Sequence, residues 1–316
     1  MPTTARAVTI AETGGLDVIH VADREVRDPG PGEVRVAVRA AAVNPSDVGV
    51  RTRGADYLRV DPPWVPGWDL AGTIESVGEG VERVSVGEAV MGAVPPARAD
   101  GGAQASLVVA PAASVVALPE GMGFAEAATL PMNGLTAQRG LELLGLSAGD
   151  TLAVAGGAGL LASYVIAFAK ADGLRVIADA KPEDEELVRS FGADVVVPRG
   201  DFTAAVREVA PDGADAVYDT ALLNRDALGA IRDGGRLLVV RGWPDAEPLP
   251  RGIEVLAVAV ADALERTEWL ERIRAFAADG RIRARVAVEL APEDAAEGQR
   301  LLEAGGLRGR AVIVFP

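Results

Sequence analysis

The sequence has no cysteine and a single histidine, His20, among its 316 residues. Without cysteine there is no disulfide, no thiolate nucleophile and no cysteine-containing zinc site. One histidine excludes a histidine-rich metal centre and would make any Ser-His-Asp triad depend on His20, which we expect to be a surface or strand residue. We therefore expect no metal in this protein.

Basic charge is also scarce. Acidic residues outnumber basic ones by 46 to 31, for a net charge of −15, and Lys170 and Lys181 are the only lysines. Such an acidic chain does not suit nucleic acid or an anionic membrane as a partner. No apolar run is long enough to span a bilayer, and residues 1–11 lack the apolar core of a signal peptide. We expect a soluble, cytoplasmic protein.

What the sequence does have is enough apolar residues for sizeable cores. Hydrophobic residues make up 49% and charged residues 24% of the chain, which is typical of a globular protein. The length exceeds that of a usual single domain, so we expect two domains.

One stretch, residues 151–180, organises the chain. The apolar run 152–155 predicts a buried parallel strand, and a turn of small residues and a helical pattern follow it. A second apolar strand, 174–178, closes the unit. The turn reads Gly157-x-Gly159-x-x-Ala162, in which the first glycine makes the tight turn, the second admits a pyrophosphate and the third small residue lets helix and strand pack. This unit predicts dinucleotide binding; a glycine-rich turn in any α/β domain is the alternative.

Two leucines in the turn argue against tight binding. Leu160 and Leu161 are larger than the small residues expected where a pyrophosphate rests. If the Leu160 side chain is the obstacle, its replacement by glycine is expected to strengthen NADPH binding.

The end of the second strand selects the dinucleotide. An acidic residue about 20 residues past the glycines would bind the ribose 2′-hydroxyl of NAD. Counting places Ala180 there, with Lys181 just after it. A missing carboxylate and a nearby cation favour a 2′-phosphate and hence NADPH, whereas a shift of one residue would bring Asp179 to this position and reverse the choice.

The N-terminal part reads as β-rich. Strand patterns at 5–10, 18–21, 33–42, 72–77, 86–90 and 107–110 are separated by glycine and proline turns. We expect a barrel-like antiparallel domain without helices here.

Beyond Pro119 the pattern becomes α/β. Helices are expected at 124–128, 133–144, 183–191, 202–209, 225–231 and 266–278, and strands at 194–197, 216–219, 236–240 and 254–260. This alternation predicts a doubly wound parallel sheet. The tail returns to strands, 286–290 and 311–315, around a helix at 292–304, and is expected to rejoin the first domain.

Several short motifs, taken in order, resemble one family. They are Ala42-Val43-Asn44-Pro45-Ser46-Asp47, Val65-Pro66-Gly67-Trp68-Asp69-Leu70-Ala71-Gly72, Val77-Gly78-Glu79-Gly80-Val81, Ala127-Ala128-Thr129-Leu130-Pro131, Gly134-Leu135-Thr136-Ala137 and Gly234-Gly235-Arg236-Leu237, together with the dinucleotide turn. Across nearly the whole chain the sequence resembles the zinc-free medium-chain dehydrogenases/reductases, the quinone oxidoreductase (ζ-crystallin-like) group.

The resemblance implies a fold, a cofactor and a reaction. It implies a GroES-like catalytic domain, residues 1–122 and 279–316, and a Rossmann domain, residues 123–278. It also implies a homodimer that uses NADPH to reduce a small apolar quinone, enone or other activated alkene.

The resemblance also assigns residues. Zinc-dependent relatives carry Cys near the Asn44 position and His at the Trp68 position, so this chain lacks both ligands. Hydrogen-bond donors must then stabilise charge on the substrate oxygen. Asn44 is expected beside the nicotinamide, where it holds the cofactor or donates to substrate; an Asx turn before Pro45 is the alternative. Tyr57 is a candidate proton source or a packed loop tyrosine.

The remaining assignments concern the cofactor. Thr136 is expected at the nicotinamide end, and Lys181 and Arg199 would flank a 2′-phosphate. Thr220 and Arg241 follow strands at the edge of the sheet where ligands bind, and Arg308 would reach the cofactor from the tail. With the turn, the predicted cofactor residues are Asn44, Thr136, Gly157, Gly159, Leu160, Leu161, Ala162, Lys181, Arg199, Thr220, Arg241 and Arg308.

Three functions are consistent with these residues. The first is an NADPH-dependent quinone or enone oxidoreductase. The second is a family member whose degraded cofactor site serves redox-neutral chemistry such as cyclisation or isomerisation. The third is an NADPH-binding protein without catalysis. The first and third require NADPH binding, and only the first requires turnover of NADPH.

Overall fold

A computed structural model describes residues 3–316. The chain divides into two compact units, Met1–Met132 with Leu264–Pro316 and Asn133–Ala263. The first unit is built from distant parts of the sequence, and the second is continuous.

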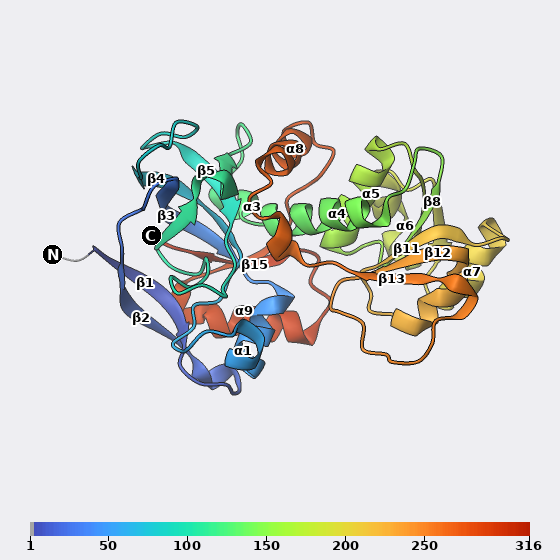
Figure 1. The fold of residues 1–316 in the computed structure, drawn as a ribbon, viewed down its shortest axis with the longest axis horizontal. Coiled ribbons are helices and arrows are strands. Elements are labelled where there is room, and N and C mark those ends of the chain that lie inside the picture. The colour runs from blue at the N-terminus through green and yellow to red at the C-terminus, as the bar shows by residue number, and fades with distance from the viewer. Residues whose placement is uncertain (1–2) are drawn as a thin grey trace. The chain divides into compact units, whose positions relative to one another are not determined.

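The first unit is a β-rich domain around a seven-stranded sheet. Its strands run in the order β14-β15-β3-β4-β5-β7, and β6 pairs with β3. In Figure 1 the C-terminal β15, in red, lies beside the blue β3, with which it pairs antiparallel. The predicted return of the tail to the first domain is therefore confirmed. The elements are β1 (Thr3–Ile10), β2 (Ile19–Val26), β3 (Glu33–Ala42), α1 (Pro45–Arg53), α2 (Ala55–Leu58), β4 (Asp69–Val77), β5 (Ala89–Ala93), β6 (Leu107–Pro111), β7 (Val115–Ala117), α3 (Phe124–Ala127), α8 (Thr267–Ala278), β14 (Val286–Leu290), α9 (Ala295–Ala304) and β15 (Arg310–Val314).

Alternating apolar residues build the core of this unit. Val34, Val36, Leu70 and Ile74 of β3 and β4 are all buried and belong to one hydrophobic cluster. Because side chains alternate across a strand, these positions fill one face of the sheet.

The expectation that the N-terminal part has no helices is wrong. α1 and α2 follow β3, and the polar sequence of α1 has too few apolar residues to show a helical period. A capping box starts α1: the Asp47 carboxylate accepts from the Asn44 backbone N–H at 2.8 Å, and Pro45 occupies the first turn. Gly54 ends the helix with φ of +47°.

The second unit is a six-stranded parallel sheet with helices between its strands. The order is β10-β9-β8-β11-β12-β13, which in chain order reads 3-2-1-4-5-6, the arrangement of a Rossmann fold. Figure 1 shows these strands passing from green through yellow to orange. The elements are α4 (Pro131–Leu144), β8 (Thr151–Ala155), α5 (Leu160–Ala171), β9 (Arg175–Ala180), α6 (Glu185–Ser190), β10 (Val195–Pro198), α7 (Phe202–Val209), β11 (Ala214–Asp219), β12 (Ile231–Val239) and β13 (Glu254–Ala257).

Two details differ from the expected elements. The segment predicted as a helix at 225–231 is the 3-10 helix η4 (Asn224–Ala230), and Asn224 has φ of +51°, which an α-helix does not accommodate. The predicted domain boundaries also placed α3 and α8 in the second domain. In the structure both helices belong to the first unit, where the Thr267 hydroxyl of α8 donates to the Ala113 carbonyl at 2.7 Å.

Candidate functional site

The glycine turn connects β8 to α5 in the second unit. Gly156 has φ of +83°, and a Cβ on Gly157 would lie 2.6 Å from the Asp179 carbonyl oxygen. Gly159 is the N-cap of α5. The tight turn is thus made at Gly156, one residue before the predicted Gly157, and Gly157 is needed for the close approach of β9. The N-terminus of α5 presents backbone N–H groups to whatever binds at this end of the sheet.

Thr220 lies against this turn. It follows β11, which pairs with β8 in the middle of the sheet. Its hydroxyl donates to the Ala155 carbonyl at 2.6 Å. The turn and Thr220 therefore lie at the carboxyl ends of the two strands where the strand order reverses, the usual ligand position in open α/β sheets.

At the end of β9 the side chain that reaches the turn is that of Asp179. Its Oδ1 accepts from the Gly156 N–H at 2.5 Å and from the Gly157 N–H at 3.1 Å. Ala180, which counting places at the ribose position, is the next residue along the strand, and its side chain points to the opposite face because successive side chains of a strand alternate; its place beside a ribose stays a prediction. Asp179 is buried, and one of its oxygens is occupied by the turn.

One cation, Arg199, lies beside Asp179, and a second, Lys181, follows β9 in the sequence. The Arg199 Nε is 3.9 Å from the Asp179 Oδ2, and Lys181 is 3.9 Å from Glu183. Both side chains are about half exposed, Arg199 at 49% and Lys181 at 54%. Arg199 therefore leaves exposed positive charge near the second oxygen of Asp179, and Lys181 adds a second exposed cation just after β9.

The structure separates the roles of the two leucines. Leu160 is 5% exposed, whereas Leu161 is half-buried. Leu160 is therefore a core residue, which makes Leu161 the better candidate for the side chain that obstructs a pyrophosphate; neither role is tested by the structure. Leu161, at the second position of α5, is the side chain left at the surface of the turn.

The two leucines form a matched pair for a binding experiment. Leu161→Gly is expected to raise dinucleotide affinity roughly tenfold, because it clears the N-terminus of α5. Leu160→Gly is expected to lower the free energy of unfolding by about 3 kcal/mol without this gain, because it opens a cavity. Isothermal titration and urea denaturation measure the two effects. An unchanged or weaker affinity of Leu161→Gly would show that this side chain is no obstacle.

The structure also shows the surroundings of the remaining predicted site residues, which come from four separate parts of the sequence. Thr136 is buried on α4, and its carbonyl accepts from the Tyr218 hydroxyl at 2.8 Å. Arg241 follows β12 and is exposed, and Arg308 is an exposed residue of the first unit. Tyr57, on α2, has the Arg53 guanidinium 4.4 Å above its ring centre. Its role as a proton source stays a prediction.

Asn44 is the centre of a buried polar network in the first unit. Its Nδ2 donates to Asp69 Oδ2 at 2.6 Å, and its Oδ1 accepts from Arg310 Nε at 3.1 Å. Asn44 is fully buried. Both the nitrogen and the oxygen of the amide are thus bonded to other residues of the protein. Asn44 therefore orients its neighbours and offers no exposed hydrogen-bond donor in this structure.

Asp47 ties α1 to the segment before β4. Its Oδ1 accepts from the Gly67 N–H at 3.0 Å, and its Oδ2 accepts from the Asn44 N–H at 2.8 Å and from Gln104 Nε2 at 3.1 Å. Asp69, in turn, accepts from the Met132 N–H at 2.6 Å. Two fully buried carboxylates therefore hold this region together.

Burial changes the acidity of both carboxyl groups. Loss of hydration raises the pKa of Asp47 to about 7, and the nearby Asp69 charge acts in the same direction, while its backbone hydrogen bonds oppose the rise. Burial likewise raises the pKa of Asp69 to about 6, against the hydrogen bonds from Met132 and Asn44 and the charge of Arg310. The pair is poised to change protonation near neutral pH.

Comparison with known proteins supports the resemblance. The alcohol dehydrogenase GroES-like domain family matches residues 30–120, and the zinc-binding dehydrogenase family matches residues 161–257. The chain is 31% identical, over 84% of its length and 69% of the relative's, to the NADPH-dependent alkenal/one oxidoreductase, chloroplastic, of Arabidopsis thaliana. It is 33% identical to the 2-methylene-furan-3-one reductase of Solanum lycopersicum, over 77% of this chain and 63% of that protein.

Solved structures agree. An NAD-dependent alcohol dehydrogenase is 32% identical with a TM-score of 0.84, over 98% of this chain and all of that one. A mycobacterial quinone oxidoreductase is 27% identical with a TM-score of 0.80, again over 98% of this chain and all of that one. The chain belongs to the medium-chain dehydrogenases/reductases, in the zinc-free quinone oxidoreductase group. It is therefore an oxidoreductase of a family that binds NAD(P).

Among residues 3–316 no three His, Cys, Asp or Glu side chains gather as a metal site. In the same part of the chain no helix is long and apolar enough to cross a membrane.

The sequence interpretation missed parts of the polar network. Arg310 and Gln104 bond to the Asn44–Asp47–Asp69 cluster from positions far away in the chain. Asp69 follows Gly67 and Trp68, and only its place in a family motif marked it. Neither Arg310 nor Gln104 has a local sequence signal, because their partners are set by strand pairing.

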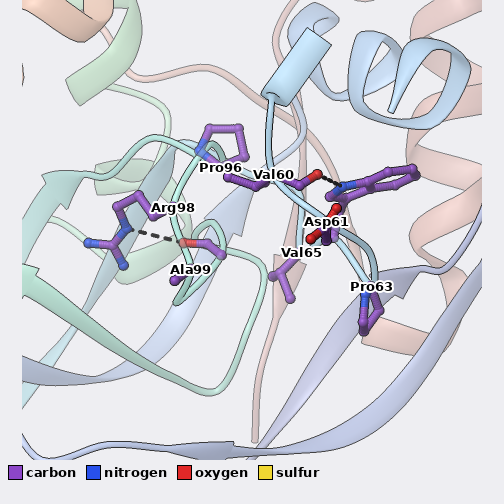
Figure 2. A pocket seen from close by; sticks show the side chains of 9 residues that line it. Val60, Asp61, Pro63, Val65, Pro96, Arg98 and Ala99 are labelled. Atoms are coloured by element: carbon purple, nitrogen blue, oxygen red, sulfur yellow. Dashed lines mark hydrogen bonds between the residues drawn. The ribbon is translucent and has the colours of Figure 1, made fainter. Parts of the chain in front are cut away.

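The first unit also contains a pocket of about 370 Å³. Figure 2 shows Asp61, Pro63 and Val65 on one side of it and Arg98 and Ala99 on the other. The Trp64 indole N–H donates to the Val60 carbonyl at 2.9 Å, and Arg98 Nε donates to the Gly101 carbonyl at 3.3 Å. These polar groups are satisfied by the protein, so the pocket by itself indicates no ligand.

Proposed function

We propose that the protein transfers hydride from NADPH to a small apolar quinone, enone or other activated alkene without a metal. The observation that carries this proposal is the glycine turn with Thr220 at the point of strand reversal, in a chain 31% identical to an NADPH-dependent alkenal/one oxidoreductase. The proposed class of hydride acceptor is taken from the names of that relative and of the 2-methylene-furan-3-one reductase.

The chain's own residues fit a dinucleotide. The backbone N–H groups that open α5 would hold the pyrophosphate, and Thr136 and Thr220 would lie along the bound molecule. Lys181 and Arg199 would hold a 2′-phosphate, because both are exposed and the nearby Asp179 carboxylate is engaged by the turn and by Arg199. When bound, NADPH supplies the hydride; the protein binds and orients both reactants and keeps water away.

The dinucleotide preference can be tested by removing the two cations. The double variant Lys181→Ala with Arg199→Ala is expected to weaken NADPH binding roughly 10- to 100-fold and to leave NADH binding unchanged. Nicotinamide fluorescence titration measures both affinities. Arg189→Ala, which removes an exposed cation paired with Glu185 on α6, is the matched control and is expected to change neither. If the wild type bound NADH more tightly than NADPH, this would indicate instead that Asp179 binds the ribose hydroxyls of NADH.

Turnover tests the reaction. Purified protein with NADPH and 2-cyclohexen-1-one or 1,4-benzoquinone is expected to consume NADPH, followed by absorbance. NADPH binding without turnover of either acceptor would favour the non-catalytic alternative. If the wild type bound neither dinucleotide and Leu161→Gly restored binding, the result would favour redox-neutral chemistry in a degraded cofactor site.

A further inference from the structure

One loop of the second unit holds a leucine in a backbone conformation that leucine disfavours. Leu222 has φ of +61° and Asn224 has φ of +51°, and Leu222 lies between β11 and the 3-10 helix η4. Asparagine tolerates the left-handed region, whereas for a bulky apolar residue such a φ is an outlier. Residues in this region persist only where the surrounding structure holds them, and they gather at ligand sites. The conformation of Leu222 therefore calls for a functional reason.

Asp219, the last residue of β11, holds the loop in this conformation. It is buried, its Oδ1 accepts from the Ala221 N–H at 3.0 Å, and its Oδ2 accepts from the Asn224 N–H at 2.7 Å. The Asn224 amide Nδ2 donates to the Leu222 carbonyl at 3.1 Å. Leu222 thus lies between two residues that a single carboxylate fixes, so the fold imposes its backbone conformation.

The side chain of Leu222 is held out to solvent. It is 39% exposed, and no other large apolar side chain of the second unit, Asn133–Ala263, whose residues are all described, is as exposed. The next residue, Leu223, packs against the hydrophobic core of this unit. An apolar side chain that is fixed at the surface in a strained conformation is suited to meet the apolar face of a ligand.

The loop packs directly against the glycine turn. A Cβ on Gly156 would lie 2.8 Å from the Thr220 Oγ1 and 3.3 Å from the Ala221 Cβ. Leu222 is the residue after Ala221, and β11 pairs in parallel with β8, the strand that leads into the turn. Leu222 therefore follows its strand at the same edge of the sheet as the turn, where ligands of open α/β sheets bind.

The strand order assigns one half of a dinucleotide to this loop. β8 lies between β9 and β11 in the sheet. A dinucleotide lies across the point of strand reversal, with its pyrophosphate at the turn after the first strand and its adenine ribose beside the end of the second strand, here β9. The nicotinamide half then extends to the opposite side of the turn, over the end of β11 and the loop that carries Leu222.

We propose that Leu222 packs against the nicotinamide half of the bound dinucleotide. This rests on the proposed function and adds to it a binding residue on the side of the turn away from Lys181 and Arg199. The contact removes apolar surface of both partners from water. Because Asp219 fixes the loop before the ligand arrives, binding does not have to order this backbone. The strain at Leu222 thereby contributes to a preformed apolar wall for the cofactor.

The test shortens the side chain and measures binding. Leu222→Ala is expected to weaken NADPH and NADH binding to the same extent, each roughly tenfold, and to leave the Tm unchanged because the side chain is exposed. Leu222→Met, which keeps an apolar side chain of similar reach, is expected to bind like the wild type. Leu222→Gly is expected to lose the same affinity and to gain about 2–4 °C in Tm, because glycine adopts this φ without strain. Val86→Ala, which shortens an exposed apolar side chain of the first unit, is the matched control and is expected to change neither affinity. Nicotinamide fluorescence titration measures the affinities.

A ligand without nicotinamide locates the contact. Adenosine 2′,5′-bisphosphate carries only the adenine half, so isothermal titration is expected to give the same affinity for the wild type and for Leu222→Ala. A loss of affinity for this ligand would place Leu222 on the adenine half and overturn the proposal. Unchanged NADPH affinity of Leu222→Ala, in a protein that reduces 2-cyclohexen-1-one or 1,4-benzoquinone, would overturn the contact and keep the reductase. Weaker NADPH binding by Leu222→Ala, in a protein that reduces neither compound, would keep the contact and overturn the reductase. A wild type that binds neither dinucleotide would overturn both.

Discussion

Replacing Asp69 by alanine is expected to lower the free energy of unfolding by about 3 kcal/mol. The Asp69 carboxylate is fully buried and accepts from the Met132 N–H and from the Asn44 amide, each at 2.6 Å. Without it, the buried Asn44 amide and the partly buried Met132 N–H lose this acceptor, and Arg310 loses the negative charge nearby. Urea denaturation followed by tryptophan fluorescence measures the loss.

Two variants control this experiment. Asp69→Asn keeps the volume and one acceptor, so it is expected to cost less than Asp69→Ala. Glu297→Ala removes an exposed acid that pairs with Arg300 on α9 and is expected to change the stability little. If Asp69→Ala cost no more than Glu297→Ala, the network around Asn44 would not hold the first unit together.

Stability is expected to fall as the pH rises from 5 to 8, and Asp47 is expected to cause much of the fall. Burial raises the pKa of Asp47 from 3.8 to about 7. Between these values the folded protein keeps a proton that the unfolded chain has released, so the contribution is fully present below about pH 4 and is lost as the pH rises through 7. Three pKa units correspond to about 4 kcal/mol over the whole range from pH 4 to 7, and about two thirds of this falls above pH 5.

The variant Asp47→Asn tests this dependence because an amide does not titrate. We expect a lower stability than wild type at pH 5, where an amide N–H faces the Asn44 and Gln104 donors, and a flatter change of stability between pH 5 and 8. A residual slope of the same sign is expected from Asp69, whose pKa is also raised. Denaturant titrations at four pH values measure both slopes. Equal slopes in variant and wild type would show that Asp47 stays ionised throughout.

Local pattern was enough to determine much of the fold. The strand 33–42 and the helix 202–209 were predicted with the bounds that the structure has, because apolar runs and helical periods are local signals. The glycine turn, the alternation that follows it and the return of the tail were also readable. The helix α1 was missed because its signal is a cap, not a period.

The functional details depended on which way individual side chains point, and only the tertiary structure decided this. Asp179, not Ala180, faces the glycine turn because strand register alternates the side chains. Leu160 enters the core and Leu161 stays at the surface because successive residues on a helix point in different directions. The sequence by itself determined the family, the two-domain architecture and the absence of cysteine and histidine ligands. The tertiary structure decided that Asn44 is engaged within the protein, because Asp69 and Arg310 meet Asn44 only when β4 and β15 pair with β3.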